Sequence, residues 1–197
     1  MKFYHMSGTL KLGDSLKPDY QRCMDLALPF VQALEQSVDC FYAMVLNGKY
    51  LRAVLEKFKL REWSDYCKWS VEGAFEYIRK TEFPGCCSRL HCNYFYDNLE
   101  SCRSLYEYDW GQASEEEQAA IHLYQVELHD DQPQRRDMRL YDQAYDAMSE
   151  REDVPFVLSC ARRYFAGEQS ANPVWEVMSD QPATAVRDAT DALKERK

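Results

Sequence analysis

The chain has 197 residues, of which 46% are hydrophobic and 14% aromatic, so it is long and apolar enough to form one well-cored domain. Its net charge of −9 argues against a protein that binds the phosphate backbone of nucleic acids through bulk positive charge. No apolar run reaches membrane-spanning length and no signal peptide is recognisable, so we expect a cytoplasmic protein with no membrane partner.

The eight cysteines are scattered along the chain, and no Cys-x-x-Cys pair occurs among them. This pattern favours reduced, buried thiols over disulfides. The one cluster, between Cys86 and Cys92, lacks a second ligand pair at the spacing of a zinc site. We therefore expect no bound metal.

The first half of the chain predicts one strand followed by helices. Residues 2–8 form a short aromatic strand. From about residue 23 to residue 81, apolar residues recur every three or four positions, which predicts a series of helices. The last of these should end at Phe83, because Pro84 and Gly85 follow. The aromatic residues at helical spacing are predicted to lie in the core.

The middle of the chain predicts two strands separated by a short helix. Residues 90–96 are rich in β-forming residues, and Asn98 is placed to cap a helix that begins at Leu99. The acidic stretch 107–118 predicts a loop, and residues 121–128 alternate in character as a strand does. Residues 129–136 are polar, include a proline and predict a connection.

The last third predicts two helices and then strands. Asp137 is placed to cap a helix marked by an apolar face from Met138 to Met148, and a second helix over residues 154–165 should end at Gly167. Residues 174–178 and 183–186 predict short strands. Strands separated by helices without a regular βαβ rhythm favour an α+β fold.

The first strand resembles the first motif of the His-Tyr-Glu class of ADP-ribosyltransferases, which includes rifampin-modifying enzymes and RNA 2′-phosphotransferases. The resemblance is carried by His5 near the end of an aromatic strand, followed by Ser7, Gly8 and Thr9. It implies that His5 binds the adenosine ribose of NAD, and that the three small residues line the cofactor pocket through main-chain donors. Met6 stands where the class has glycine. Taken alone, His5 could equally be a structural histidine whose hydrogen bonds are made within the fold.

Two later stretches resemble the second and third motifs. Tyr94 lies in a strand followed by a short helix, as does the class tyrosine that packs on nicotinamide, and Tyr96 is the alternative if the register differs. Glu176, between Trp175 and Val177, matches the glutamate that binds the nicotinamide-ribose hydroxyl and stabilises the sugar cation. Two tyrosines packing a sheet face and a glutamate facing water remain the structural alternatives.

Some relatives carry aspartate in place of the third-motif glutamate. The weaker candidates for that role are Asp137, Asp142 and Asp146, all of which we interpret as solvated helix positions.

The resemblance implies a single domain over residues 1–197, built on a split β-sheet with a helical insertion at about residues 23–81. The implied function is transfer of ADP-ribose from NAD to a protein, nucleic acid or small molecule, by a toxin, defence factor or modifying enzyme. An inhibitory protein partner would be compatible with such a role.

Two other functions remain open on the same fold. One is a binding module that has lost catalysis, which Met6 and the tyrosine at position 96, where the class has threonine, both favour. The other is an RNA 2′-phosphotransferase, which the few basic residues near the motifs disfavour. No Gly-x-Gly-x-x-Gly or Walker motif occurs, so a Rossmann mode of NAD binding is not expected.

Overall fold

The computed structural model describes residues 2–18 and 21–194, and it divides the chain into two compact units. The unit that carries the strands, here the strand unit, comprises Met1–Pro18, Cys92–Arg135 and Val174–Lys197. The other, here the helical unit, comprises Asp19–His91 and Arg136–Pro173. The predicted α+β fold is confirmed. The helical unit is larger than the predicted insertion, because residues 136–173 belong to it as well.

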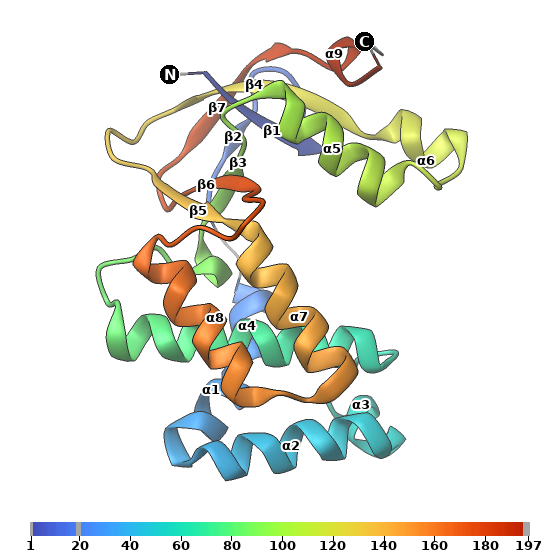
Figure 1. Ribbon diagram of the computed structural model, residues 1–197. Coiled ribbons are helices and arrows are strands. Elements are labelled where there is room, and N and C mark those ends of the chain that lie inside the picture. The colour runs from blue at the N-terminus through green and yellow to red at the C-terminus, as the bar shows by residue number, and fades with distance from the viewer. Residues whose placement is uncertain (1, 19–20, 195–197) are drawn as a thin grey trace. The chain divides into compact units, whose positions relative to one another are not determined.

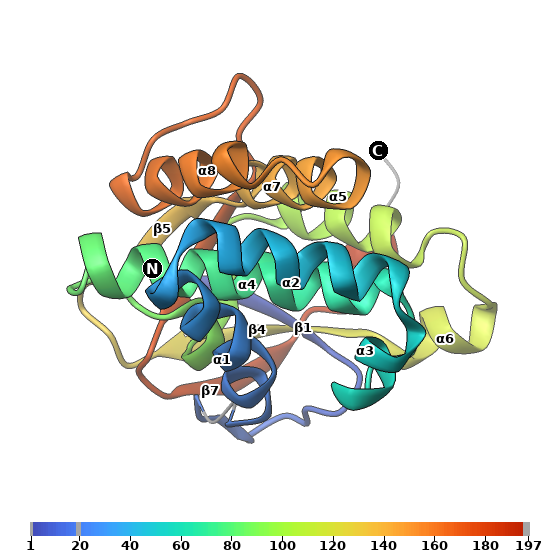
Figure 2. The same ribbon diagram turned by 90° about the horizontal axis from the view of Figure 1, so that it is seen from below.

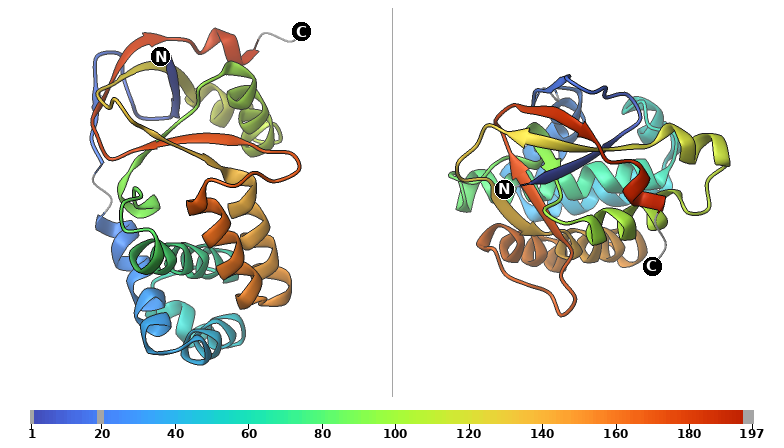
Figure 3. Two further views of the ribbon diagram at one scale, coloured as in Figure 1. Left: turned by 60° about the vertical axis from the view of Figure 1, so that its left-hand side comes forward. Right: turned by 90° about the horizontal axis from the view of Figure 1, so that it is seen from above.

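The strand unit is built from two sheets (Figure 1). The four-stranded sheet has the order β1-β4-β7-β2, with bounds Phe3–Ser7 (β1), His122–Leu128 (β4), Ala183–Asp188 (β7) and Ser15–Leu16 (β2). The three-stranded sheet has the order β3-β6-β5, with bounds Asn93–Phe95 (β3), Trp175–Ser179 (β6) and Gln134–Asp137 (β5). The pairings of β1 with β4, β4 with β7, β2 with β7 and β3 with β6 are antiparallel, and they can be followed in Figure 3.

Buried side chains of β4 alternate between two apolar clusters. Tyr124 and Val126 lie in a cluster that takes residues from both sheets, including Phe3, Phe95 and Val177. Leu123 points the other way and belongs to a second cluster. The members of that second cluster are Tyr96, Cys102, Leu123 and Leu193.

Three helices belong to the strand unit. Their bounds are Leu99–Trp110 (α5), Glu115–Ala120 (α6) and Asp191–Lys194 (α9). The cluster around Leu123 includes Cys102 of α5 and Leu193 of α9, so these two helices cover that face of the four-stranded sheet. Asn98 caps α5 as predicted, since its side chain accepts a hydrogen bond from the Ser101 N–H at 2.8 Å.

The helical unit places α4 against helices from both of its segments, and Figure 2 shows α2 alongside it. The bounds are Gln21–Gln36 (α1), Val38–Tyr50 (α2), Arg52–Lys57 (α3), Trp63–Glu82 (α4), Arg89–His91 (η1), Met138–Arg151 (α7) and Val154–Ala166 (α8). Helices α1 and α4 approach closely at Gly73, where an added Cβ would lie 2.5 Å from the Phe30 Cβ. Helix α8 ends at Gly167 as predicted, with φ of 76°.

Among the described residues, no helix combines the length and the apolar character needed to cross a membrane. All eight cysteines lie in the described ranges and are free. The prediction of buried thiols holds for four of them, Cys67, Cys92, Cys102 and Cys160, whereas Cys40 is exposed and the other three are partly buried.

The prediction of a loop over residues 107–118 is wrong. Helix α5 continues to Trp110, and α6 begins at Glu115 after a capping box in which the side chains of Ser114 and Glu117 satisfy each other's main-chain N–H groups. Acidic residues in the first turn of α6 are also favoured by the helix dipole. The polar character of this stretch therefore marks a solvent-facing helix.

Two predictions around residue 137 are also wrong. The predicted connection over residues 129–136 contains the start of β5. Asp137 was expected to be solvated, but its side chain is fully buried. It caps α7 by accepting from the Arg139 N–H at 3.0 Å, and it accepts from the Ser170 N–H at 2.7 Å. These two N–H donors explain how a carboxylate is accommodated there.

Candidate functional site

The three strands that carry the predicted catalytic residues lie side by side. Strand β6, with Glu176, pairs with β3, which carries Tyr94. The residue next to β3, Tyr96, pairs with Tyr4 of β1 through hydrogen bonds of 2.8 Å in both directions. Among the described residues the strand order is therefore β5-β6-β3-β1-β4-β7-β2, with the bridge between Tyr4 and Tyr96 joining the two sheets.

The two sheets separate directly after this bridge. In a continued antiparallel ladder, the Tyr94 carbonyl would accept a hydrogen bond from the Met6 N–H. Instead it accepts one from the His5 imidazole, with 2.9 Å between Nδ1 and the carbonyl oxygen. The alternation of the strand directs the main-chain N–H and C=O of Met6 toward the gap, whereas its side chain packs against the Tyr96 cluster. The split thus leaves a short main-chain edge beside His5.

The hydrogen bond fixes the chemical state of His5. A carbonyl oxygen can only accept, so Nδ1 must carry a proton, and the neutral ring then presents Nε2 as an acceptor. Burial lowers the pKa of His5, and the hydrogen bond to Tyr94 opposes this shift in part. The imidazole is therefore suited to accept a hydrogen bond from a hydroxyl group at neutral pH.

Tyr94 and Glu176 project from the same face of the β3–β6 ladder. Tyr94 lies opposite Met178, and Glu176 is two residues from Met178 on the same strand. Diagonal neighbours of this kind lie about 7–8 Å apart, within the reach of long side chains. Glu176 is only 2% exposed, so the alternative of a glutamate facing water is wrong.

The imidazole of His5 lies on the other side of β3. Its ring centroid is 6.0 Å from that of Phe95, which belongs to the cluster between the sheets. Phe95 and Tyr94 alternate along the strand, so their side chains leave opposite faces. The structure therefore joins His5 to the main chain of Tyr94, but the His5 imidazole lies on the opposite face of β3 from the side chains of Tyr94 and Glu176.

The residues after His5 form a tight turn. The Ser7 hydroxyl accepts hydrogen bonds from the N–H groups of Thr9 and Leu10, at 3.2 and 3.1 Å. Gly8 and Thr9 are exposed, and an added Cβ at Gly8 would meet its nearest neighbour at 3.4 Å. The Ser7 side chain therefore holds the turn, and Gly8 and Thr9 are the parts open to a ligand.

Tyr96, the alternative to Tyr94, lies within the apolar cluster that also contains Leu123 and Leu193. Tyr94 is only partly buried. This difference favours Tyr94 as the ring that a ligand would meet.

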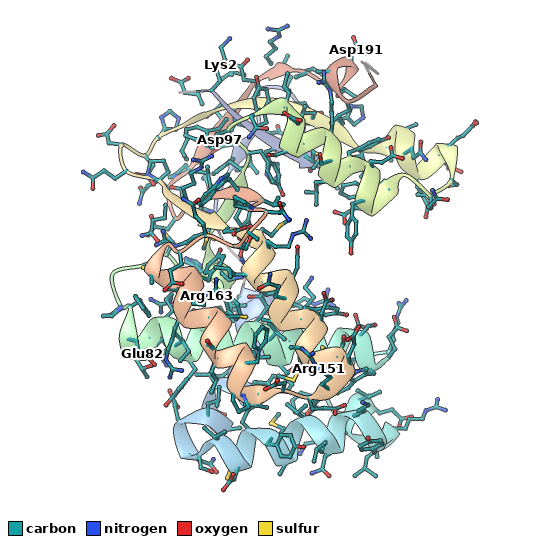
Figure 4. All side chains as sticks on the ribbon, in the orientation of Figure 1. Lys2, Glu82, Asp97, Arg151, Arg163 and Asp191 are labelled. Atoms are coloured by element: carbon teal, nitrogen blue, oxygen red, sulfur yellow. The ribbon has the colours of Figure 1, made fainter. Side chains whose placement is uncertain are left out.

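Arg135 of β5, which the sequence pattern did not mark as a site residue, lies beside Trp175, the first residue of β6. The Arg135 guanidinium lies 4.4 Å above the Trp175 ring, and its Nε is 3.1 Å from a carboxylate oxygen of Asp97, which Figure 4 labels. Trp175 precedes Glu176 and points to the opposite face of the strand. The basic pair Arg135-Arg136 is visible in the sequence, but its position beside Trp175 depends on the pairing of β5 with β6.

A comparison with curated proteins finds no match. A scan against protein families matches residues 30–190 to a model described as a protein of unknown function, DUF2441. This match spans the whole helical unit from α2 onward and most of the strand unit, including Tyr94 and Glu176. The chain therefore belongs to the DUF2441 family of proteins of unknown function.

Proposed function

We propose that the protein transfers ADP-ribose from NAD to an acceptor nucleophile. The observation that supports this most strongly is the strand order, because it sets the strands of Glu176, Tyr94 and His5 next to one another at the split. Three residues from distant parts of the sequence thus come from three neighbouring strands, with Tyr94 and Glu176 on one face of β3 and the His5 imidazole on the other.

His5 binds and orients the dinucleotide. Its Nδ1–H is held by the Tyr94 carbonyl, so Nε2 accepts a hydrogen bond from a ribose hydroxyl. The main-chain N–H and C=O of Met6 face the gap beside it and supply a donor and an acceptor. The Met6 side chain packs against the Tyr96 cluster and so points out of the plane of these main-chain groups.

Tyr94 and Glu176 act on the nicotinamide riboside. The Tyr94 ring offers an aromatic face to the flat, cationic pyridinium. When the glycosidic C1′–N bond breaks, its electron pair goes to the nicotinamide nitrogen, and positive charge develops on the ribose. The Glu176 carboxylate binds the ribose 2′-hydroxyl and stabilises that charge. The acceptor then forms a bond to C1′ through its lone pair, and its proton passes to Glu176 and on to water.

A labelling experiment tests the activity and the acceptor class together. The purified protein is incubated with labelled NAD and a cell lysate, and samples are then treated separately with protease and with nuclease. We expect a labelled product in the presence of wild-type protein and a loss of label of about 10²–10³-fold with Glu176→Gln, the size typical of removing one stabilising group. Undiminished labelling by the Glu176→Gln variant would remove Glu176 from the mechanism.

The second candidate function is a catalytically inactive binding module. The near-complete burial of Glu176 favours it, because a carboxylate that acts on a ribose must be reached by that ribose. In this case NAD would raise the melting temperature of the protein, and neither label transfer nor release of nicotinamide would occur.

A further inference from the structure

Helix α2 concentrates exposed apolar surface. Nine large hydrophobic side chains are exposed among the described residues, and four of them fall between residues 38 and 51: Val38, Tyr42, Tyr50 and Leu51. Single exposed hydrophobic residues are ordinary, whereas several on one element indicate a surface that is covered by a partner.

The opposite side of α2 is apolar as well. Phe41 and Val45 are fully buried, and an added Cβ at Gly48 would lie 2.0 Å from the Tyr66 ring of α4. Apolar residues thus lie on two sides of α2, and only one of these sides is covered. Figure 4 shows side chains projecting from α2 on the side away from α4.

The apolar residues on this side form one ridge. Val38, Tyr42, Leu46 and Tyr50 are spaced by four, so they lie one above another along the i±4 direction of the helix surface; Leu46 is half-buried and the other three are exposed. Ridges of this kind pack between the same ridges of another helix at a crossing angle of about −50°, the commonest arrangement of packed helices. The ridge can therefore pack against a copy of itself.

The charges along α2 favour a second copy as the occupant. Asp39 lies in the first turn, and no other charged residue occurs before Lys49 in the last turn. Lys49 is bound to Glu152. Arg52, two residues past the end of α2, pairs with Glu56 at 3.0 Å, although its side chain is 91% exposed. In an antiparallel pair of α2 helices, the acidic end of each copy meets the basic end of the other, and the two helix dipoles oppose.

We propose that this face is a dimer interface, in which α2 packs against α2 of a second copy around a two-fold axis near Met44. Asp39 then lies close to Arg52 of the second copy, and the ridges interdigitate between these two ion pairs. One helix of 13 residues covers less than the roughly 800 Å² per partner of a standard stable interface, so the dimer forms reversibly and at high concentration. The dimer does not depend on the proposed activity.

Sedimentation velocity of the full chain, over about 10–500 µM, tests the proposal. We expect the sedimentation coefficient to rise with concentration toward that of a dimer. Tyr50→Glu should weaken association at least about tenfold, because Tyr50 is 70% exposed at the end of the ridge. Tyr108→Glu is the matched control, since Tyr108 is 87% exposed on α5 and should leave association unchanged.

A charge exchange tests the antiparallel arrangement. Asp39→Arg should weaken the dimer, and the addition of Arg52→Glu should restore it, because each copy again meets opposite charge. Melting temperatures of the variants verify that they fold. A chain that is monomeric at every concentration, a dimer that tolerates Tyr50→Glu, or a double variant that is not restored would overturn the proposed interface.

Discussion

Replacing Glu72 with glutamine should destabilise the protein far more than the same replacement at Glu56. Glu72 forms an ion pair with Arg89 inside the helical unit, with distances of 3.2 Å to Nε and 3.3 Å to Nη2. The guanidinium also donates to the Tyr164 hydroxyl at 2.8 Å and lies 4.1 Å from the centre of the Tyr141 ring. Both charged side chains are only 8% exposed.

The magnitude follows from this burial. Removal of one partner leaves a charge in a site from which water is excluded, which costs about 3–5 kcal/mol. With a urea dependence of about 2 kcal/mol per molar, the unfolding midpoint of Glu72→Gln should fall by about 1.5–2.5 M. Glu56 pairs with Arg52 at 3.0 Å, but both side chains are largely exposed, at 65% and 91%. Loss of an exposed pair of this kind should shift the midpoint by less than about 0.3 M.

Urea titrations followed by far-ultraviolet circular dichroism measure both variants. A third variant, Glu72→Leu with Arg89→Met, replaces the whole pair by apolar side chains and should recover most of the lost stability. Equal midpoints for Glu72→Gln and Glu56→Gln would refute the view that Glu72 and Arg89 are buried and that each charge needs the other to be stable there. A double variant less stable than the Glu72→Gln variant would refute the magnitude assigned to the stranded charge.

Two further predictions concern His5 and Gly73. Burial lowers the pKa of His5, so as the pH falls the unfolded chain binds a proton at this residue before the folded chain does. The folded state therefore loses stability as the pH falls below about 6.5, the ordinary pKa of histidine, and the loss stops once the pH is below the pKa of His5 in the folded protein. A His5→Gln variant should therefore lose less stability than the wild type between pH 7.5 and 5, as measured by urea midpoints at each pH, and parallel curves would contradict this. Gly73→Ala should overpack against Phe30, which costs about 1–3 kcal/mol of folding free energy, and so should lower the melting temperature. Gly85→Ala should change the melting temperature little, because the added Cβ would meet open space. A melting temperature of Gly73→Ala equal to that of Gly85→Ala would show that α1 and α4 do not approach so closely.

Most helices and strands were predictable because their signals are local. The spacing of apolar residues and the Phe83-Pro84-Gly85 stop place α4. Asn98 marks the start of α5, and Gly167 marks the end of α8. The helix at Glu115 was missed although its signal was present, since Ser114 and Glu117 have the spacing of a capping box. The start of β5 carries no comparable pattern, because Gln134, Arg135 and Arg136 are all polar.

The candidate site depends on contacts that are distant in the sequence. The resemblance identifies His5, Tyr94 and Glu176 one at a time, but their neighbouring strands follow from the pairing of Tyr4 with Tyr96 and of β3 with β6. The burial of Asp137 likewise depends on the Ser170 N–H from another part of the chain. A single sequence shows which residues suit a site, and the sheet pairing decides which of them share it.

Release of nicotinamide from NAD by the purified protein tests the proposed activity most directly. We expect steady release by the wild type and by Glu127→Gln, a control glutamate exposed on β4, with a loss of about 10²–10³-fold in Glu176→Gln. Equal release by the Glu176→Gln and Glu127→Gln variants, or no release by the wild type while NAD still raises its melting temperature, would contradict transfer of ADP-ribose at this site.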